Sequence, residues 1–353
     1  MPDALYPRII EYVRTTAWAL LPQTLAVMVD ILRLRAEGHR LTPEEISERI
    51  QGQREDAGPA IIAARGNARG VGGGGGVAVI PLVGAVVHRA DAFEDISGFT
   101  SVERFRARLQ EALNNDAVGS IVIDVDSPGG SVSGITEIAQ MVRDGRESKK
   151  IVAVANTLMA SAAYWIASAA SEIVATPSAN VGAIGVFAAH ADLSTQMEML
   201  GIKVTLVSAG KFKVEGNPFE PLDADAEASI QRSVDESYGL FTLDVAKGRG
   251  VTVAKVRSGF GEGRLLSADE AKAENLVDRV ATLAATVQGL LGRGGGSGRR
   301  ADEIGIGDQG TELLDGAIMG EPNGETTGGS VEAVPGPSAD VRRRKLALFK
   351  AMV

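Results

Sequence analysis

Cysteine is absent from this chain, which excludes disulfide bonds and thiolate metal sites and leaves the redox compartment open. Histidine is scarce as well. The three that occur, His39, His88 and His190, are too scattered to predict a metal cluster. Aromatic residues make up only 4% of the sequence, whereas alanine and glycine are abundant, so helices can pack closely against a sheet. The apolar content of 44% is enough to form a core.

An excess of basic residues is also lacking. The formal net charge of −9 and the isoelectric point near 5.1 argue against a nucleic-acid partner. The apolar stretch 17–29 is interrupted by Pro22-Gln23-Thr24 and closed by Asp30, so it is too short to cross a bilayer. Residues 1–8 lack the basic start of a secretory signal. We therefore expect a soluble protein with no membrane span, cytoplasmic in a bacterial cell.

Composition divides the chain into four parts. Residues 1–69 are predicted to be a helical N-terminal extension, and residues 70–76 a glycine-rich linker. A phosphate-binding loop is the alternative for the linker, but no Gly-Lys-Ser/Thr follows it. Residues 77–290 form the main domain. Residues 291–353 are predicted to be a disordered tail, ending in a basic segment at 341–353 that either binds a partner as a helix or stays solvated.

Strands and helices are predicted to alternate in the main domain, which indicates an α/β fold with mainly parallel strands. The predicted strands are 77–83, 120–125, 151–155, 173–175, 184–188 and 204–207. The predicted helices are 101–114, 131–143, 160–170, 193–200, 224–247 and 267–274.

Two segments of this domain suggest the parts of a hydrolytic site. Ser161 lies in Met159-Ala160-Ser161-Ala162-Ala163-Tyr164, between a predicted strand and a predicted helix. Upstream, Asp126-Ser127-Pro128-Gly129-Gly130 also follows a strand, and its glycines would let backbone amides approach a ligand closely. Amides aimed at one point stabilise an oxyanion. Each segment alone is equally compatible with a structural role.

A serine hydroxyl needs a base, and a neutral lysine can act as one. Lys213 lies in Gly210-Lys211-Phe212-Lys213-Val214, where Phe212 and Val214 would bury it in part and so favour its neutral form. Lys211 is the competing candidate, and a solvated loop lysine is the alternative for both.

Taken together and in order, the motifs resemble the SppA (protease IV) family of signal peptide peptidases. Besides the three segments above, the resemblance rests on Ala175-Thr176-Pro177, Val181-Gly182-Ala183-Ile184-Gly185-Val186, Gly263-Arg264 and Leu276-Val277-Asp278. It implies a Clp/crotonase-like fold of repeated ββα units and a ring-like homo-oligomer. It also implies a Ser-Lys serine endopeptidase that needs no cofactor or metal, with Ser161 as nucleophile and Lys213 as general base. The implied oxyanion hole consists of amides at Gly129, Gly130 and Ala162.

The chain departs from that family in two ways. Ala162-Ala163 replaces a frequent Gly-Gly, and Ala183 replaces a frequent serine whose hydroxyl is thought to contact the lysine. With no predicted anchor, the chain is most similar to the prophage capsid-assembly (head maturation) proteases. That similarity implies phage scaffold and capsid proteins as substrates or partners, and a location inside proheads.

Other functions fit parts of the same pattern. They are a cytoplasmic SppA-like peptidase that degrades peptides, a Ser161–His190 protease of the Clp type, a crotonase-like enzyme acting on acyl-CoA thioesters, and a capsid-assembly scaffold protein that has lost activity. Loss of proteolysis in Lys213→Ala would favour the Ser-Lys enzyme over the Ser-His enzyme. Labelling of Ser161 by an acylating probe would distinguish both from the crotonase-like enzyme.

Overall fold

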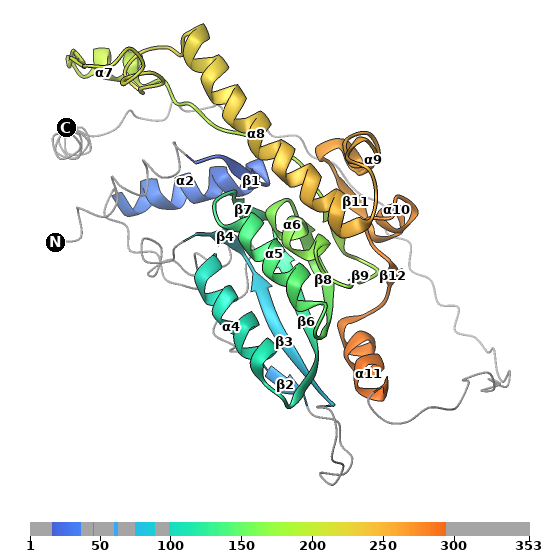
Figure 1. Ribbon diagram of the computed structural model, residues 1–353. Helices are drawn as coiled ribbons and strands as arrows, with labels where there is room; N and C mark the ends of the chain where they lie inside the picture. The colour runs from blue at the N-terminus through green and yellow to red at the C-terminus, as the bar shows by residue number, and fades with distance from the viewer. Residues whose placement is uncertain (1–15, 37–44, 46–59, 63–74, 89–98, 294–353) are drawn as a thin grey trace, which may run out of the picture. The chain divides into compact units, whose positions relative to one another are not determined.

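The structure, a computed structural model, describes residues 16–36, 45, 60–62, 75–88 and 99–293 (Figure 1). Most of the predicted linker at 70–76 and the tail beyond residue 293 lie outside these residues, and their predicted character is not tested. The helix α11 (Leu283–Arg293) spans the predicted start of the tail at residue 291.

The larger sheet is mainly parallel and forms the centre of the domain. Its strand order is β11-β10-β8-β6-β3-β2, with β9 beside β8 and β12 beside β9. The pairs among β3, β6, β8, β9, β10 and β12 are parallel, whereas β2 and β11 pair antiparallel. The strands are β2 (Ala60–Ile62), β3 (Gly76–Val83), β6 (Val118–Ser127), β8 (Lys150–Ala160), β9 (Glu172–Ala175), β10 (Asn180–Gly182), β11 (Leu265–Ser267) and β12 (Arg279–Val280).

A smaller sheet has the order β1-β7-β4-β5. Its strands are β1 (Trp18–Leu20), β4 (Ala85–Val87), β5 (Phe99–Ser101) and β7 (Gly129–Ser131). The strand β1 runs antiparallel to β7, and the other two pairs are parallel. Both sheets contain parallel strands joined through helices, so the prediction of an α/β fold is confirmed.

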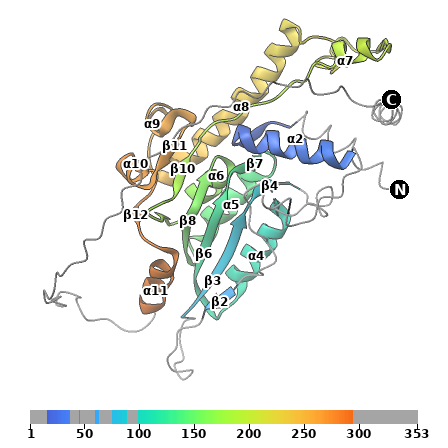
Figure 2. The same ribbon diagram turned by 180° about the vertical axis from the view of Figure 1, so that it is seen from behind.

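Helices cover both faces of the larger sheet (Figures 1 and 2). The helices α4, α5, α6 and α8 contribute to the cluster that packs on one face, while Val287 of α11 packs on the valines of the other. The helices are α2 (Pro22–Ala36), α4 (Val102–Asn114), α5 (Ile135–Gly145), α6 (Ala162–Ser168), α7 (Ser194–Met199), α8 (Ala224–Arg249), α9 (Val253–Gly259) and α10 (Ala268–Ala273), with a 3₁₀ turn at Gly261–Gly263.

The strand β6 shows why these layers form. Successive side chains point to opposite faces, so Ile121 and Ile123 join the cluster under α4, α5 and α6, while Val122 joins the cluster under α11. A strand buried on both sides has an almost continuous apolar sequence. The helix α4 begins where the Ser101 hydroxyl accepts the amide of Arg104.

Three local predictions are wrong. Residues 204–207 form no strand, and Val207 is 95% exposed, because β-branched residues make a strand only where a neighbour supplies a ladder. Residues 184–188 contribute only an isolated bridge at Phe187. The extension expected to be helical also contains the strands β1 and β2, which pair with strands of the main domain. The division into domains itself stays a prediction.

Candidate active site

Ser161 occupies a sharp turn between β8 and α6. Its φ of 53° and ψ of −118° are rare for a residue with a side chain, and such backbone strain is typical of functional positions. The Ser161 amide donates a 2.7 Å hydrogen bond to the Gly182 carbonyl, which fixes the turn. The serine is only 1% exposed.

The predicted glycine turn lies directly against this serine. Gly129 has a φ of +101°, and a Cβ atom added to it would lie 2.9 Å from Ser161 Cβ and 3.1 Å from the Ala162 nitrogen. A side chain is therefore excluded at Gly129 both by its backbone conformation and by space. The tertiary structure thus brings together two segments that the sequence separates by a whole α/β unit.

The amides of this turn have different surroundings. The Gly129 amide donates to Ser127 Oγ at 3.2 Å, and the Ser127 hydroxyl in turn donates to the Gly84 carbonyl at 2.6 Å. The Gly129 amide is thereby engaged. Ala162 is the first residue of α6, where an amide has no partner within the helix. Of the three amides expected to form an oxyanion hole, that of Gly129 is therefore the weakest candidate.

Two acidic residues precede the glycine turn on β6. Burial raises the pKa of Asp124 and that of Asp126, and hydrogen bonds with Asn156 and Thr157 of β8 oppose the rise. These polar contacts join the ends of β6 and β8, from which the glycine turn and Ser161 both follow.

The Ser161 hydroxyl has a weak contact to the segment after β10. Its Oγ lies 3.4 Å from the Gly185 carbonyl oxygen. Two residues earlier, Ala183 has a φ of 52°, and its amide donates to the Arg264 carbonyl at 2.8 Å. The rival base, His190, contacts the Asn217 carbonyl at 3.1 Å through Nε2.

Lys213 lies in a turn after Gly210, and its amide donates to the Gly210 carbonyl at 3.2 Å. It is exposed, as are its neighbours Lys211 and Phe212. The expected partial burial of Lys213 is therefore wrong for the single chain, because no strand forms before it to hold the turn against the domain. Within the part of the chain that the structure describes, no hydrogen bond joins Lys213 to Ser161.

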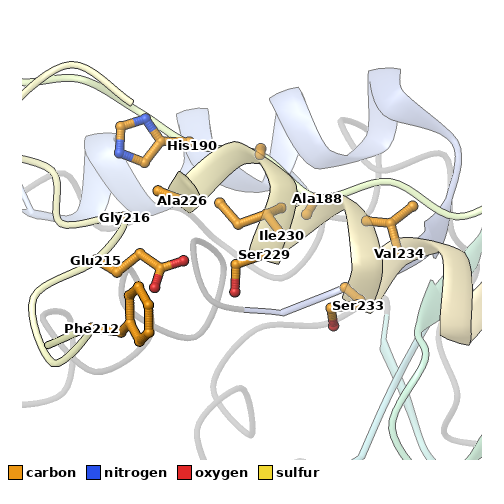
Figure 3. Close-up of a pocket in the computed structure, with 12 residues that line it drawn as sticks. Ala188, His190, Phe212, Glu215, Gly216, Ala226, Ser229, Ile230, Ser233 and Val234 are labelled. Atoms are coloured by element: carbon orange, nitrogen blue, oxygen red, sulfur yellow. The ribbon is translucent and has the colours of Figure 1, made fainter. Parts of the chain in front are cut away.

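A cavity of about 360 Å³ lies near this turn (Figure 3). Phe212 and Glu215 line one side, and Ser229 and Ser233 of α8 line the other. Ala17, just before β1, also borders it. Ser161 does not line the cavity, so this space is separate from the nucleophile turn.

Comparison with known proteins finds a family model that matches part of the chain. Residues 143–291 match Peptidase family S49. The chain contains a peptidase S49 domain. The matched region of this S49 domain includes Ser161, Ala162 and Lys213 but begins after the glycine turn. Among the described residues, no helix is both long and apolar enough to cross a membrane.

Curated relatives of the chain include phage and bacterial proteins. It is 35% identical over 205 residues to "Capsid assembly protease C" of Escherichia phage lambda, covering 58% of this chain and 46% of the relative. It is 34% identical over 181 residues to "Head-tail preconnector protein GP5" of Enterobacteria phage P21, covering 51% and 36%. It is 29% identical over 206 residues to "Protease 4" of Salmonella typhi, covering 58% and 32%. The alignments thus span less than half of these relatives, while the resemblance to the SppA family is confirmed.

One solved structure similar to this chain is the catalytic domain of the ClpP protease from Plasmodium falciparum. The match has a TM-score of 0.37 and 14% identity, and it covers 57% of this chain and 84% of that one.

Several features of the site have no signal in the sequence. The strand β1 lies beside the glycine turn, although its residues appear only as part of a broken apolar stretch. The buried carboxylate of Asp244 accepts a hydrogen bond from Trp165 of α6, and local periodicity cannot predict that contact. Both depend on segments that are distant along the chain.

Proposed function

We propose that the chain is a serine endopeptidase in which Ser161 is the nucleophile and Lys213 is the general base. The observation that carries the proposal is the strained Ser161 turn, held against Gly129 and the first amide of α6. A nucleophile on a strained strand-to-helix turn projects its hydroxyl away from its own backbone. Nearby amides then stabilise the charge that develops on the substrate carbonyl.

In the proposed reaction, Lys213 accepts the proton of the Ser161 hydroxyl, whose oxygen attacks the peptide carbonyl carbon. The oxyanion accepts hydrogen bonds from the Gly130 and Ala162 amides. The bond to the leaving amine breaks as that amine takes the proton, and an acyl-enzyme remains. Water then attacks the ester with the help of Lys213 and releases the acid.

The exposed position of Lys213 bears on how the dyad is completed. A lysine accepts a proton only when it is neutral, and burial favours the neutral form. We therefore propose a homo-oligomer in which a second copy covers the turn of Lys213. Exposed apolar side chains in the same connection between β10 and α8 support a covering partner, since Met199 is 77% and Val207 95% exposed.

Phage scaffold and capsid proteins are the proposed substrates, and a growing prohead in a bacterial cytoplasm is the proposed location. Support comes from the similarity to the lambda protein, whose name states a role in capsid assembly. The alternatives are a cytoplasmic peptidase without a capsid substrate and an inactive assembly scaffold. Co-expression with a phage scaffold protein and capsid protein decides among them, because only a head-maturation protease gives a processing pattern that Ser161→Ala abolishes.

The dyad itself is tested with matched lysine variants. Lys213→Ala should reduce cleavage of a protein substrate by at least about a thousandfold, as Ser161→Ala should. Lys211→Ala removes another exposed lysine two residues away and should change the rate by less than about threefold. Proteolysis that survives in Lys213→Ala would refute the lysine as base.

Mixing tests the proposed oligomer. If Lys213 of one copy serves Ser161 of another, co-refolded Ser161→Ala and Lys213→Ala chains should recover a measurable part of the activity that neither has alone. Light scattering on the unmixed protein gives its oligomeric state. A monomer with full activity would contradict the covering partner.

A further inference from the structure

The strand β1 occupies the space beside the candidate nucleophile. One wall of this space is β7, which begins at Gly129, and the other is the segment after β10, where Gly185 contacts the Ser161 hydroxyl. A peptide that reached Ser161 would have to pass between these two walls. The chain's own residues 17–21 lie there instead.

On the first wall, β1 forms an antiparallel ladder with β7. The paired residues are Trp18 with Ser131, Ala19 with Gly130, and Leu20 with Gly129. Hydrogen bonds continue the ladder at both ends, from the Val132 amide to the Ala17 carbonyl at 3.1 Å and from the Leu21 amide to the Pro128 carbonyl at 3.0 Å. The edge of β7 that faces the site is therefore filled.

On the second wall, Trp18 pairs with Phe187. The Trp18 amide donates to the Phe187 carbonyl at 2.8 Å, and the Phe187 amide donates to the Trp18 carbonyl at 2.9 Å. The polar groups of successive residues in a strand point to opposite sides. The backbone N–H and C=O groups of Ala19 consequently face Gly130 of β7. The Gly130 amide is one of the two proposed for the oxyanion hole.

The Ala19 carbonyl lies at the nucleophile turn. The position that a Cβ atom on Gly129 would occupy is 2.3 Å from the Ala19 oxygen, 2.9 Å from Ser161 Cβ and 3.1 Å from the Ala162 nitrogen. These three atoms thus surround one point. A substrate carbonyl under attack would need the same neighbours, a serine on one side and a donor amide on the other.

Burial shows how completely the segment fills the space. Trp18 and Ala19 are fully buried, Leu20 is 4% exposed, and Ser161 beneath them is 1% exposed. The segment is uncharged, and its residue nearest Ser161 is small. These are the properties of an extended peptide ligand held mainly through its backbone.

We propose that residues 17–21 are a tethered, substrate-like ligand of the active site, which must leave before another peptide can bind. The proposal rests on the proposed function for its meaning but on the geometry of β1 for its evidence. One edge of β7 can pair with only one strand. A tethered strand has an effective concentration in the millimolar range, so it competes strongly with free peptides.

Peptide binding tests the proposal without requiring catalysis. The probe is a fluorescein-labelled hexapeptide with the sequence of residues 16–21, and binding is followed by fluorescence anisotropy in the Ser161→Ala background. Ala19→Asp introduces a charge into the buried strand and should expel it. The matched control Ala26→Asp makes the same change on the exposed side of α2. We expect at least tenfold tighter binding to the Ala19→Asp chain than to the control, and equal binding would overturn the proposal.

A reversible disulfide between β1 and β7 provides a second test that does not depend on correct folding of the Ala19→Asp variant. Trp18 and Ser131 are direct cross-strand partners, a separation that a disulfide can span, and the chain has no other cysteine. A Trp18→Cys/Ser131→Cys chain should exclude the peptide when oxidised and bind it at least tenfold better when reduced. Peptide binding that is the same in both states would overturn the proposal.

Labelling of Ser161 by a fluorophosphonate separates this proposal from the proposed function. In the double-cysteine chain with Ser161 intact, we expect labelling to be at least tenfold faster after reduction. If the peptide binds only after reduction but Ser161 is never labelled, the tethered ligand is supported and the serine nucleophile is refuted. If labelling is equally fast in both states, the nucleophile is supported and the tethered ligand is refuted.

Discussion

The indole Nε1 of Trp165 donates a 2.9 Å hydrogen bond to the Asp244 carboxylate, and both residues are buried. Trp165 lies on α6, the helix that Ser161 precedes, and Asp244 lies on α8. The Trp165 ring also stacks on Phe241 of α8, with 4.5 Å between ring centroids and 6° between planes. Arg143 of α5 approaches the same carboxylate at 3.6 Å. The helix behind the candidate nucleophile is therefore held by α8 through one polar and one aromatic contact.

Removing the carboxylate should loosen that helix. Asp244→Ala leaves the Trp165 indole and the Arg143 guanidinium without their buried partner, which should cost about 2–4 kcal/mol of unfolding free energy. Asp244→Asn keeps an acceptor for the indole and should cost less. The control is Asp235→Ala, an exposed position on α8 that should change stability by less than about 0.5 kcal/mol. Urea unfolding measures all three, and equal values for Asp244→Ala and Asp235→Ala would contradict the role of the pair.

The strained backbone of Ser161 predicts that this functional turn lowers the stability of the protein. Glycine adopts a positive φ without penalty, whereas alanine does not. Ser161→Gly should therefore be more stable than Ser161→Ala by about 1 kcal/mol, although both lack the hydroxyl. Thermal unfolding of the two variants decides this, and an alanine variant at least as stable as the glycine variant would show that the turn is unstrained.

Gly130 should tolerate no side chain. A Cβ atom there would lie 1.8 Å from the Val86 carbonyl oxygen of the neighbouring strand, far inside any real contact. Gly130→Ala should thus cost more than about 3 kcal/mol or prevent folding. The matched change Gly239→Ala falls on α8 where no atom lies within 4 Å, and it should stabilise the protein by up to about 1 kcal/mol. Soluble expression and urea unfolding provide the comparison.

The ion pair between Arg249 and Asp278 predicts a specific pH dependence. Burial opposes ionisation of Asp278, but hydrogen bonds from Arg249 and the Ile173 amide outweigh it and lower its pKa. An aspartate whose pKa is lower in the folded state adds stability above its unfolded pKa and loses it as pH falls through the folded value.

Asp278→Asn should therefore reduce stability by about 1 kcal/mol at pH 7, a modest amount because the carboxylate is partly exposed. Its deficit relative to the parent should shrink as pH falls below 4. Unfolding in urea at several pH values measures the deficit. A deficit that is the same at pH 7 and pH 3 would mean that the charge of Asp278 contributes nothing.

Local pattern was sufficient for much of this fold. The helical spacing of Val102, Phe105, Leu109 and Leu113 predicts α4 within residues 101–114. Long helical periodicity predicts α8, and the apolar runs predict β3, β6 and β8. Each helix buries one apolar face, and each of these strands buries both faces. The spacing of apolar residues along the sequence therefore predicts them. Boundaries moved by a few residues, since β8 continues to Ala160 where only its first half was predicted.

The local sequence pattern did not predict the structure correctly where the pairing strand is missing or distant along the chain. Residues 204–207 have the composition of a strand but no neighbouring strand, and they remain without regular structure. Residues 18–20 have no strand signal of their own, yet they form β1 because β7 and Phe187 supply hydrogen bonds on both sides. In both cases, long-range pairing rather than propensity decided the outcome.

The candidate site divides in the same way. From residue types and spacing alone follow a serine that opens a helix, two glycines after a strand, and motifs in the order of a peptidase family. The contact of Gly129 with the Ser161 turn, the exposure of Lys213 and the position of β1 beside the candidate nucleophile appear only in the folded chain. Residue types and spacing constrain local geometry, whereas contacts between distant segments depend on how the whole core packs.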